Sequence, residues 1–272
     1  MILIGESGAT KIDWRLINGE KIQQFQQKGF NAATHHPGEF LSGIEEFIPD
    51  PSKIKRFYLY AAGIIDEIRL PLNDAIEGIF PNAHVEVASD LLAAARGLCG
   101  NSPGMVGILG TGANLCEYDG KQIASRIPPL GYILGDEGGG SYMGRKLVAR
   151  YVRKQFGEPL LEKIRQQYPE VTEAEVIRQV YSQSANTYLA SFTRFIVDNQ
   201  NDPEIYQLAH RCLHDYFDAF KVDTQLPYRF TGSIAFYLGN ILRKVSAERG
   251  IHLDLIVQSP IAGLTLYHQE HG

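Results

Sequence analysis

The stretch GMVGILGTGANLCEYDGKQIASRI, residues 104–127, decides the fold. Residues 105–109 form an apolar run typical of a buried strand, and residues 110–113 then carry almost no side-chain bulk. The strand pattern restarts at residues 115–118, turns at Asp119-Gly120, which is a strong hairpin signal, and returns at residues 122–127. The stretch therefore predicts a strand, a bend of small residues, and a hairpin of two more strands.

The start of the chain repeats this arrangement. ILIGESGATKIDW, residues 2–14, contains an apolar run, a bend with Gly5, Gly8 and Ala9, and an alternating strand; Asn18-Gly19 and a returning strand follow. Alone, the bend is typical of a tight hairpin that needs glycine. Because it occurs at the head of both halves, we expect two duplicated domains whose bends present backbone N–H groups to a polyphosphate.

Further patterns indicate an α/β fold in each half. The first half continues with a helix at residues 39–47, a strand at 57–64, a helix at 71–79, a strand at 84–89 and a helix from Asp90. In the second half, residues 141–220 are largely helical by spacing, and their aromatic stripes are typical of core. A strand at 227–230, a helix at 234–250, a strand at 253–258 and a terminal helix at 259–268 follow.

Composition excludes several classes of protein. The 272 residues are 44% hydrophobic and 21% charged, with a net charge of −5, which argues against nucleic acid or an anionic membrane as partner. No segment approaches the ~20 apolar residues of a membrane span, and the first residues do not resemble a signal peptide, so we expect a cytoplasmic protein. Cys99, Cys116 and Cys212 show no CxxC spacing and predict buried thiols rather than a disulfide framework or a zinc site.

Four motifs carry a family resemblance that spans essentially the whole chain. They are GESGATKIDW (5–14), SDLLAAARGLCG (89–100), GILGTGAN (107–114) and GDEGGGSYMGR (135–145). Together they resemble the N-acetylglucosamine kinase-like group of the BadF/BadG/BcrA/BcrD ATPase family, within the actin-like, sugar-kinase and heat-shock ATPase superfamily. The combination of GTGAN with GDEG is specific, whereas the N-terminal bend alone is not.

The resemblance implies an α/β fold of two ribonuclease-H-like domains that bind ATP between them. The first covers residues 1–103 together with a C-terminal helix at about 259–272, and the second covers 104–258 with a helical insertion at about 141–221. The implied reaction is transfer of the γ-phosphoryl group of ATP to a hydroxyl of an amino sugar, with N-acetylglucosamine expected. The implied partners are this sugar and ATP, and a homodimer is compatible with the family.

Asp90 is the candidate catalytic residue. Its position between a strand and a helix, taken alone, indicates a helix N-cap. The resemblance instead implies a general base that takes the proton of the sugar hydroxyl.

The resemblance also implies groups of binding residues. The residues expected at ATP and its phosphates are Gly8, Ala9, Thr10, Lys11, Gly110, Thr111, Gly112, Gly232 and Ser233. Those expected at the sugar are Asn31, Asp90, Asn114, Asp136 and Glu137. Plainer interpretations remain open for three of them: Lys11 as a solvated strand residue, Asn31 as a loop residue in the left-handed region, and Glu137 as a partner of helix N–H groups.

Two positions depart from the family pattern. Glu6 stands where the family carries the aspartate that holds Mg²⁺ through water, and its extra methylene moves the carboxylate outward by about 1.5 Å. We therefore expect Glu6 at the metal, with Mn²⁺ as an alternative to Mg²⁺. Leu130 replaces a tryptophan that packs against the sugar in relatives that phosphorylate N-acetylglucosamine.

Two other functions fit the family. One is an ATPase that activates a radical dehydratase, which requires cysteines presented at a subunit interface for an iron–sulfur cluster. The other is a regulator that binds sugar or nucleotide and has lost catalysis, which Glu6 and Leu130 keep open. The zinc-bearing CxCGxxGCxE motif of another bacterial sugar-kinase family is absent from the sequence.

Overall fold

The chain folds into two compact units. The computed structural model describes residues 1–8, 11–29, 41, 43–44, 46–222 and 225–271. Unit 1 contains residues 1–102, 119–123 and 260–272, and unit 2 contains residues 103–118 and 124–259. The C-terminal segment therefore returns to the N-terminal unit.

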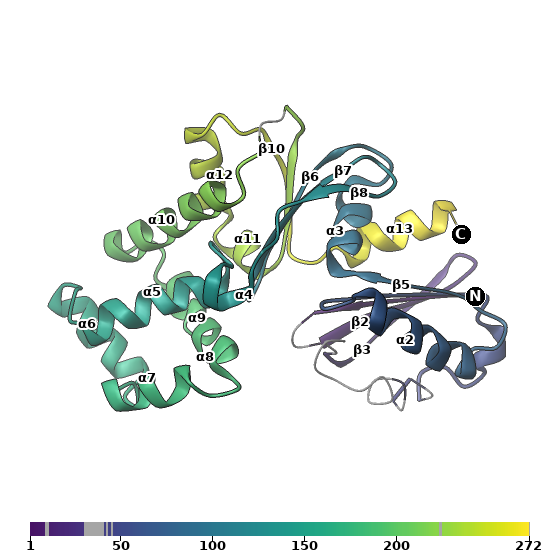
Figure 1. Cartoon of the computed structure of the whole chain (residues 1–272), viewed down its shortest axis with the longest axis horizontal. Coiled ribbons are helices and arrows are strands. Elements are labelled where there is room, and N and C mark those ends of the chain that lie inside the picture. The colour runs from purple at the N-terminus through teal and green to yellow at the C-terminus, as the bar shows by residue number, and fades with distance from the viewer. Residues whose placement is uncertain (9–10, 30–40, 42, 45, 223–224, 272) are drawn as a thin grey trace. The chain divides into compact units, whose positions relative to one another are not determined.

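Unit 1 is built on a five-stranded sheet with the order β3-β2-β1-β4-β5 (Figure 1). The first three strands are antiparallel neighbours, and β4 and β5 run parallel to β1. The strands are β1 (Ile2–Ser7), β2 (Lys11–Asn18), β3 (Lys21–Lys28), β4 (Arg56–Ala61) and β5 (His84–Ser89). Because Ser7, Ala61 and Ser89 are in register, the parallel strands end together, and the residues that follow them lie at one edge of the sheet.

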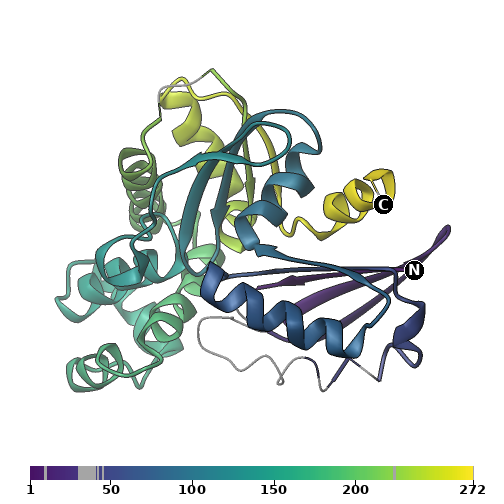
Figure 2. The same ribbon diagram turned by 45° about the vertical axis from the view of Figure 1, so that its right-hand side comes forward.

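Helices cover both faces of this sheet (Figures 1 and 2). α2 (Asp66–Ile79) buries Leu72 and Ile76 in a cluster that contains Leu3, Ile12 and Trp14. On the opposite face, α3 (Asp90–Cys99) and α13 (Ile261–His271) pack against each other and over Ile4 and Tyr60. Alternate residues of β1 and β2 thus enter two different cores.

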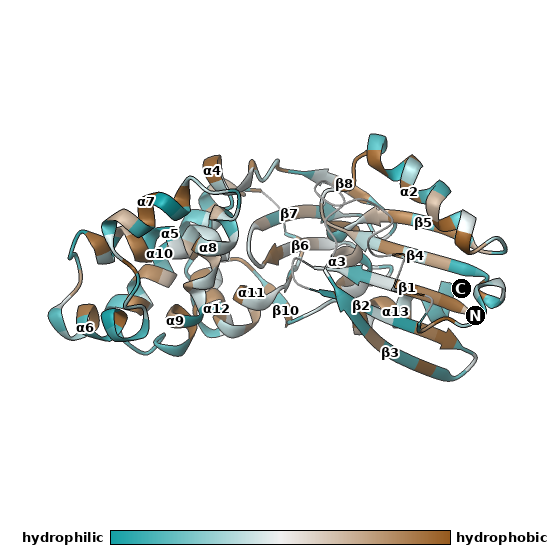
Figure 3. Ribbon diagram, turned by 90° about the horizontal axis from the view of Figure 1, so that it is seen from below, coloured by the Kyte–Doolittle hydropathy of each residue, from teal (hydrophilic) through white to brown (hydrophobic). Residues whose placement is uncertain are grey.

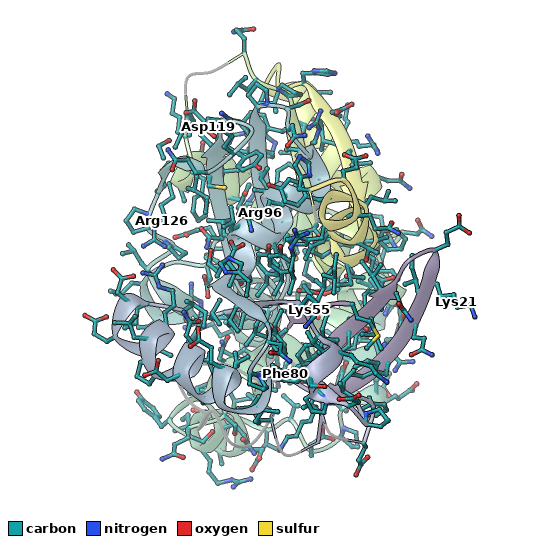
Figure 4. All side chains as sticks on the ribbon, turned by 90° about the vertical axis from the view of Figure 1, so that its right-hand side faces the viewer. Lys21, Lys55, Phe80, Arg96, Asp119 and Arg126 are labelled. Atoms are coloured by element: carbon teal, nitrogen blue, oxygen red, sulfur yellow. The ribbon has the colours of Figure 1, made fainter. Side chains whose placement is uncertain are left out.

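A buried polar cluster joins α13 to the sheet. Arg96 of α3, labelled in Figure 4, donates to the Tyr60 hydroxyl at 2.6 Å and to Glu86 Oε1 at 2.6 Å. The Tyr60 hydroxyl lies 2.9 Å from His268 Nε2, and the His268 ring stacks on Tyr58 with centroids 3.7 Å apart. Burial lowers the pKa of His268 to about 3, so the ring is neutral and its Nε2 can accept the proton of the Tyr60 hydroxyl, whose oxygen accepts from Arg96.

Unit 2 repeats the topology of unit 1 in its sheet. The order β10-β9-β6-β7-β8 matches unit 1 strand for strand, with β6 antiparallel to β7 and parallel to β9. Its strands are β6 (Gly104–Leu109), β7 (Ala113–Tyr118), β8 (Ile123–Arg126), β9 (Tyr228–Thr231) and β10 (Leu253–Val257). This match confirms the duplication that the two bends predict.

Helices inserted between β8 and β9 form most of the remainder of unit 2. They are α4 (Gly131–Leu134), α5 (Gly140–Val152), α6 (Glu158–Gln167), α7 (Glu173–Val180), α8 (Ala185–Ser191), α9 (Thr193–Asp198) and α10 (Pro203–Ala219); α11 (Ser233–Tyr237) and α12 (Gly239–Glu248) lie between β9 and β10. One large core joins these helices to the sheet through Met105, Leu115, Tyr216 and Phe230. Figure 3 shows the apolar residues of the sheets and helices in brown.

The observed elements confirm the predicted α/β class and correct several boundaries. α2 begins at Asp66, five residues before the expected start at Pro71, which lies inside the helix. The predicted single helix at 234–250 is two helices, because the chain departs from helical geometry at Leu238, before Gly239. Of the helix expected at 39–47, residues 39, 40, 42 and 45 lie outside the described residues, and residues 43–44 and 46–47 are in turns rather than in a regular helix. No helix in the described ranges is long and apolar enough to cross a membrane.

Candidate active site

Unit 1 places the N-terminal bend at the end of β1. The Gly8 N–H donates to the Lys11 carbonyl at 2.9 Å, so this amide closes the hairpin. The Lys11 ammonium binds both carboxylate oxygens of Asp13, at 2.8 and 3.2 Å. Lys11 is thus an exposed strand residue whose ammonium is paired with Asp13. Ala9 and Thr10, the other phosphate candidates here, lie outside the described residues.

Glu6 and Asp13 form a cross-strand pair of carboxylates. They are opposite each other in the β1–β2 register, so their side chains lie on the same face of the sheet. Asp13 is buried and also accepts from Gln26 Nε2 at 2.7 Å, while Glu6 is partly buried. Oxygen donors of this type suit a hard divalent cation.

Asp90 begins α3 at the same edge of the sheet. The N-cap of α3 is Ser89, whose hydroxyl accepts from the Leu92 N–H at 3.2 Å, so the interpretation of Asp90 as the cap is wrong. Asp90 is partly buried; its Oδ1 accepts from the Leu91 N–H at 2.8 Å, and Oδ2 accepts no hydrogen bond from the described residues. Burial raises the pKa of Asp90, and the Leu91 N–H opposes this shift. β5 lies two strands from β1, so Asp90 and Glu6 are separated by roughly 10 Å along the sheet edge.

Unit 2 places the second bend against the start of α5. The Gly110 carbonyl accepts from the Gly140 N–H at 2.8 Å, and the Thr111 carbonyl accepts from the N–H and hydroxyl of Ser141 at 2.9 and 3.0 Å. The N–H groups of Thr111 and Gly112 donate to no group within the described ranges. Two consecutive backbone donors without a protein acceptor can bind an anion such as phosphate.

Asp136 lies directly beside this bend. It is buried, adopts a left-handed backbone with φ of 56°, and its Oδ1 accepts from the Ala113 N–H at 3.2 Å. A Cβ on Gly112 would lie 2.8 Å from Asp136 Oδ2, so glycine is required for this approach. Burial raises the pKa of Asp136, and Glu137 adds to the shift. Glu137 itself is partly buried.

Asn114 follows the bend on β7 and is partly buried. Its Oδ1 accepts from the Leu115 N–H at 3.0 Å. Its Nδ2 donates to nothing in the part of the chain that is described, and so offers a donor to a hydroxyl.

Gly232 and Ser233 stand where β9 ends beside β6. Gly232 has φ of 108°, and a Cβ there would lie 2.3 Å from the Leu109 carbonyl oxygen, so a side chain cannot be placed between the two segments. Ser233 begins α11 and is exposed. The turn therefore contacts the beginning of the 110–112 bend.

The structure thus brings the sequence-predicted residues together in two groups, one in each unit. Unit 1 carries Glu6, Gly8, Lys11 and Asp90 at one sheet edge, and unit 2 carries the bend, Asp136, Glu137, Asn114 and the Gly232 turn. Asn31 lies outside the described residues. Leu130 is 64% exposed and directly precedes the short helix α4, whose carbonyls at Tyr132 and Ile133 accept from Arg145.

Sequence reasoning missed Asp13 and Tyr216. Asp13 follows Lys11 on the polar side of the alternation, which indicates an exposed residue, but α3 and α13 cover that face of the sheet. Tyr216 reads as one apolar position in a helical stripe, although its hydroxyl donates to the Asn114 carbonyl at 3.0 Å. The signal in the sequence that could have identified Asp13 as a paired carboxylate is its position between Lys11 and Arg15 on the same face of the strand.

A second cluster lies away from these residues, in unit 2. Nε2 of His210 and Nε2 of His214, one turn apart on α10, lie 2.9 and 3.0 Å from Glu248 Oε2. His214 Nδ1 accepts from Arg249 Nε at 3.0 Å, so the His214 proton resides on Nε2, the nitrogen that faces Glu248. A metal ion bound to His214 Nε2 would require the ring proton to move to Nδ1, but Nδ1 already accepts a hydrogen bond from Arg249. Hydrogen bonds to Glu248 therefore account for this cluster without a metal ion.

Comparison with solved structures gives close and distant relatives. A candidate N-acetylglucosamine kinase from Porphyromonas gingivalis is 37% identical, with a TM-score of 0.93 and 99% of each chain covered. A candidate N-acetylglucosamine kinase from Chromobacterium violaceum is 17% identical, with a TM-score of 0.73 and 98% of each chain covered. A ROK family glucokinase from Streptomyces griseus, in complex with glucose and AMPPNP, is 18% identical, with a TM-score of 0.57 and coverage of 100% of this chain and 99% of its own. No family model and no curated protein matches the sequence.

The duplicated sheets with their glycine-rich bends, and the match to the Porphyromonas gingivalis protein, place the chain among the sugar-kinase-like proteins of the actin-like ATPase superfamily. The identity of 37% over 99% of both chains confirms the resemblance found in the motifs. The chain belongs to the N-acetylglucosamine kinase-like group of the BadF/BadG/BcrA/BcrD ATPase family.

Proposed function

We propose that the protein transfers the γ-phosphoryl group of ATP to a hydroxyl of N-acetylglucosamine or a closely similar amino sugar. The observation that carries the proposal is the similarity, over 99% of both chains, to the Porphyromonas gingivalis candidate N-acetylglucosamine kinase. The arrangement of donors and carboxylates in the two units supports it independently.

The phosphate chain is assigned to the two bends. The unengaged N–H groups of Thr111 and Gly112 bind phosphate oxygens in unit 2, with Gly110 providing space for close approach. For unit 1, we propose Gly8, Ala9, Thr10 and Lys11 as contacts of the same phosphate chain. Gly232 and Ser233 form the turn against which the adenosine lies.

Glu6 is the proposed metal residue. Its carboxylate is the kind of hard oxygen donor that Mg²⁺ or Mn²⁺ requires, with water completing the coordination, whereas both oxygens of the neighbouring Asp13 are bonded to Lys11 or Gln26. When bound, the cation neutralises charge on the transferring phosphoryl group.

Asp90 is the proposed general base. Its raised pKa brings the carboxylate nearer to the range in which it accepts a proton effectively, and Oδ2 is available to a sugar hydroxyl. Asn31, Asn114, Asp136 and Glu137 bind the other hydroxyls and orient the acceptor oxygen toward the γ-phosphate.

Two observations bear on the competing functions. Cys99, Cys116 and Cys212 are buried and lie in α3, β7 and α10, so they do not form the exposed pair that a shared iron–sulfur cluster requires. Asp90, whose loss would indicate a regulator without catalysis, is present with an available oxygen.

A coupled ADP-release assay tests the proposal. Purified protein with ATP and Mg²⁺ is given N-acetylglucosamine, N-acetylmannosamine, anhydro-muramic acid, glucose or glucosamine. We expect N-acetylglucosamine to give the largest kcat/KM. Absence of sugar-dependent ADP release with all five sugars would exclude the kinase, and a clear preference for another sugar would reassign its substrate.

A further inference from the structure

Tyr216 connects the helical insertion of unit 2 to two parts of the candidate sugar site. It lies in α10, close to the end of the insertion, and is fully buried. Its hydroxyl donates to the Asn114 carbonyl at 3.0 Å, across a long separation in sequence. Burial raises the pKa of Tyr216 well above its ordinary value, so the hydroxyl keeps its proton and remains a donor.

The body of Tyr216 contacts the segment that carries Asp136. A Cβ on Gly138 would lie 2.7 Å from Tyr216 Cβ, and Gly138 adopts a left-handed backbone with φ of 76°. The GDEG segment therefore rests directly on the helix at this residue. One side chain thus contacts both the backbone of Asn114 and the turn that follows Asp136.

The Asn114 side chain makes one hydrogen bond within the described residues. Its Oδ1 accepts from the Leu115 N–H, and its Nδ2 donates to no group in the described ranges. With only the hydrogen bond from Leu115, among the described residues, to hold its side chain, Asn114 can direct its Nδ2 toward a sugar only if its own backbone is held in place. The Tyr216 hydroxyl fixes the carbonyl of that same residue.

We propose that Tyr216 is a positioning residue for the sugar, acting through the backbone of Asn114 and the turn after Asp136. The inference rests on the proposed function, in which Asn114 and Asp136 bind the acceptor sugar. It assigns to the insertion a role in sugar affinity beyond completing the hydrophobic core.

The decisive variant is Tyr216→Phe, which removes the hydroxyl and keeps the ring. Tyr142→Phe is the matched control, because it removes a tyrosine hydroxyl that donates to Asp215, the neighbouring residue on α10, at 2.8 Å. Both variants lose one hydrogen bond and should lower the melting temperature to a similar degree. We expect Tyr216→Phe alone to raise the KM for the sugar about three- to tenfold, with the KM for ATP unchanged.

A double-mutant cycle separates positioning from general destabilisation. In an Asn114→Ala background, Tyr216→Phe should raise the sugar KM by clearly less than in the parent, because the residue through which it acts is missing. Equal effects of Tyr216→Phe and Tyr142→Phe on the sugar KM, or full additivity with Asn114→Ala, would overturn the inference.

The ADP-release assay on the parent protein tests the proposed function separately from the inference about Tyr216. If it shows sugar-dependent ADP release, the variants test the inference through KM. If it shows none, calorimetric titration of the same variants with N-acetylglucosamine reads sugar affinity directly, and unchanged affinity or absence of binding would reject the positioning role.

Discussion

Asp90 and Ser89 are neighbours at the start of α3 but make different hydrogen bonds. Ser89 caps the helix through the Leu92 N–H, and Asp90 retains one carboxylate oxygen without a partner in the described ranges. The two residues therefore allow the structural and chemical roles of this helix start to be separated by substitution.

We predict that Asp90→Asn lowers kcat about 10²- to 10⁴-fold while leaving ATP affinity close to that of the parent. The carboxamide oxygen can still accept from the Leu91 N–H, so the fold should survive. Ser89→Ala is the control: it should lose about 1 kcal/mol of stability and keep most activity. Steady-state kinetics and thermal unfolding of both variants check this, and parent-like turnover by Asp90→Asn would show that Asp90 is not the base.

At Glu6 the question is which metal ion supports turnover. Its side chain is one methylene longer than the aspartate of the family, and Asp13 lies opposite it on the same sheet face. We predict that Mn²⁺ supports turnover at least as well as Mg²⁺, because a longer and more mobile carboxylate is less demanding of octahedral geometry. Glu6→Asp should shift the preference toward Mg²⁺, and Glu6→Gln should weaken both. Activity measured against the concentration of each metal would contradict a metal role if all three proteins gave the same curves.

At the scale of elements, the 110–112 bend is held between α5 and the segment after α4. Its carbonyls accept from Gly140 and Ser141, and Asp136 reaches the Ala113 N–H across Gly112. The bend is therefore fixed on its carbonyl side and leaves two amide donors available.

We predict that Gly112→Ala loses about 1–3 kcal/mol of stability, because its Cβ would lie 2.8 Å from Asp136 Oδ2. Gly110→Ala is the matched substitution in the same bend, since a Cβ there meets no atom within 4 Å. Its free energy of unfolding should remain within about 1 kcal/mol of the parent. Chemical denaturation of both variants distinguishes them, and equal losses would show that the approach of Asp136 does not require glycine.

The terminal helix α13 carries a pH-dependent contribution to stability. His268 is buried against Tyr58 and Tyr60, and burial, with Arg96 adding positive charge, lowers its pKa to about 3. The unfolded chain takes up this proton near its ordinary pKa of about 6.5, whereas the folded chain does not until about 3. The contribution is thus fully present above pH 6.5 and is lost as the pH falls toward 3.

We predict that, as the pH falls from about 6.5 toward 3, His268 lowers the free energy of unfolding of the parent by up to about 1.4 kcal/mol per pH unit. His268→Gln should be less stable than the parent at pH 7.5 and should show a shallower decline between pH 6.5 and 4.5. His84→Gln, at an exposed histidine, is the control and should follow the parent. Denaturation curves at several pH values test this; parallel declines in parent and His268→Gln would be the contrary result.

The elements also show what sequence could and could not predict. Repeated small-residue bends predicted two similar sheets, because a strand, bend and hairpin form from local patterns. The cap at Ser89 was missed because serine and aspartate are adjacent and both cap helices well. Asp13 and Tyr216 were missed because their roles depend on residues brought together only by the tertiary fold, which periodicity does not encode.

At the scale of the whole molecule, each unit carries only part of the proposed site. Unit 1 holds Glu6, Lys11 and Asp90, and unit 2 holds the 110–112 bend, Asp136 and the Gly232 turn. The proposed reaction requires Asp90 of unit 1, as the proposed base, and the proposed phosphate donors of unit 2 to act in one phosphoryl transfer. Ligands that contact both units therefore favour the arrangement in which the two units lie close together.

We predict that sugar and a non-hydrolysable ATP analogue together reduce the radius of gyration measured by small-angle X-ray scattering. Either ligand alone should reduce it less, because each alone makes only part of the contacts that link the units. Asp90→Asn should still compact with both ligands, since the substitution removes a proton acceptor and leaves the phosphate donors in place. If the scattering profile of the parent were unchanged with both ligands bound at saturation, the two groups of residues would not be joined by closure, and the assignment of phosphate contacts to both units would have to be abandoned.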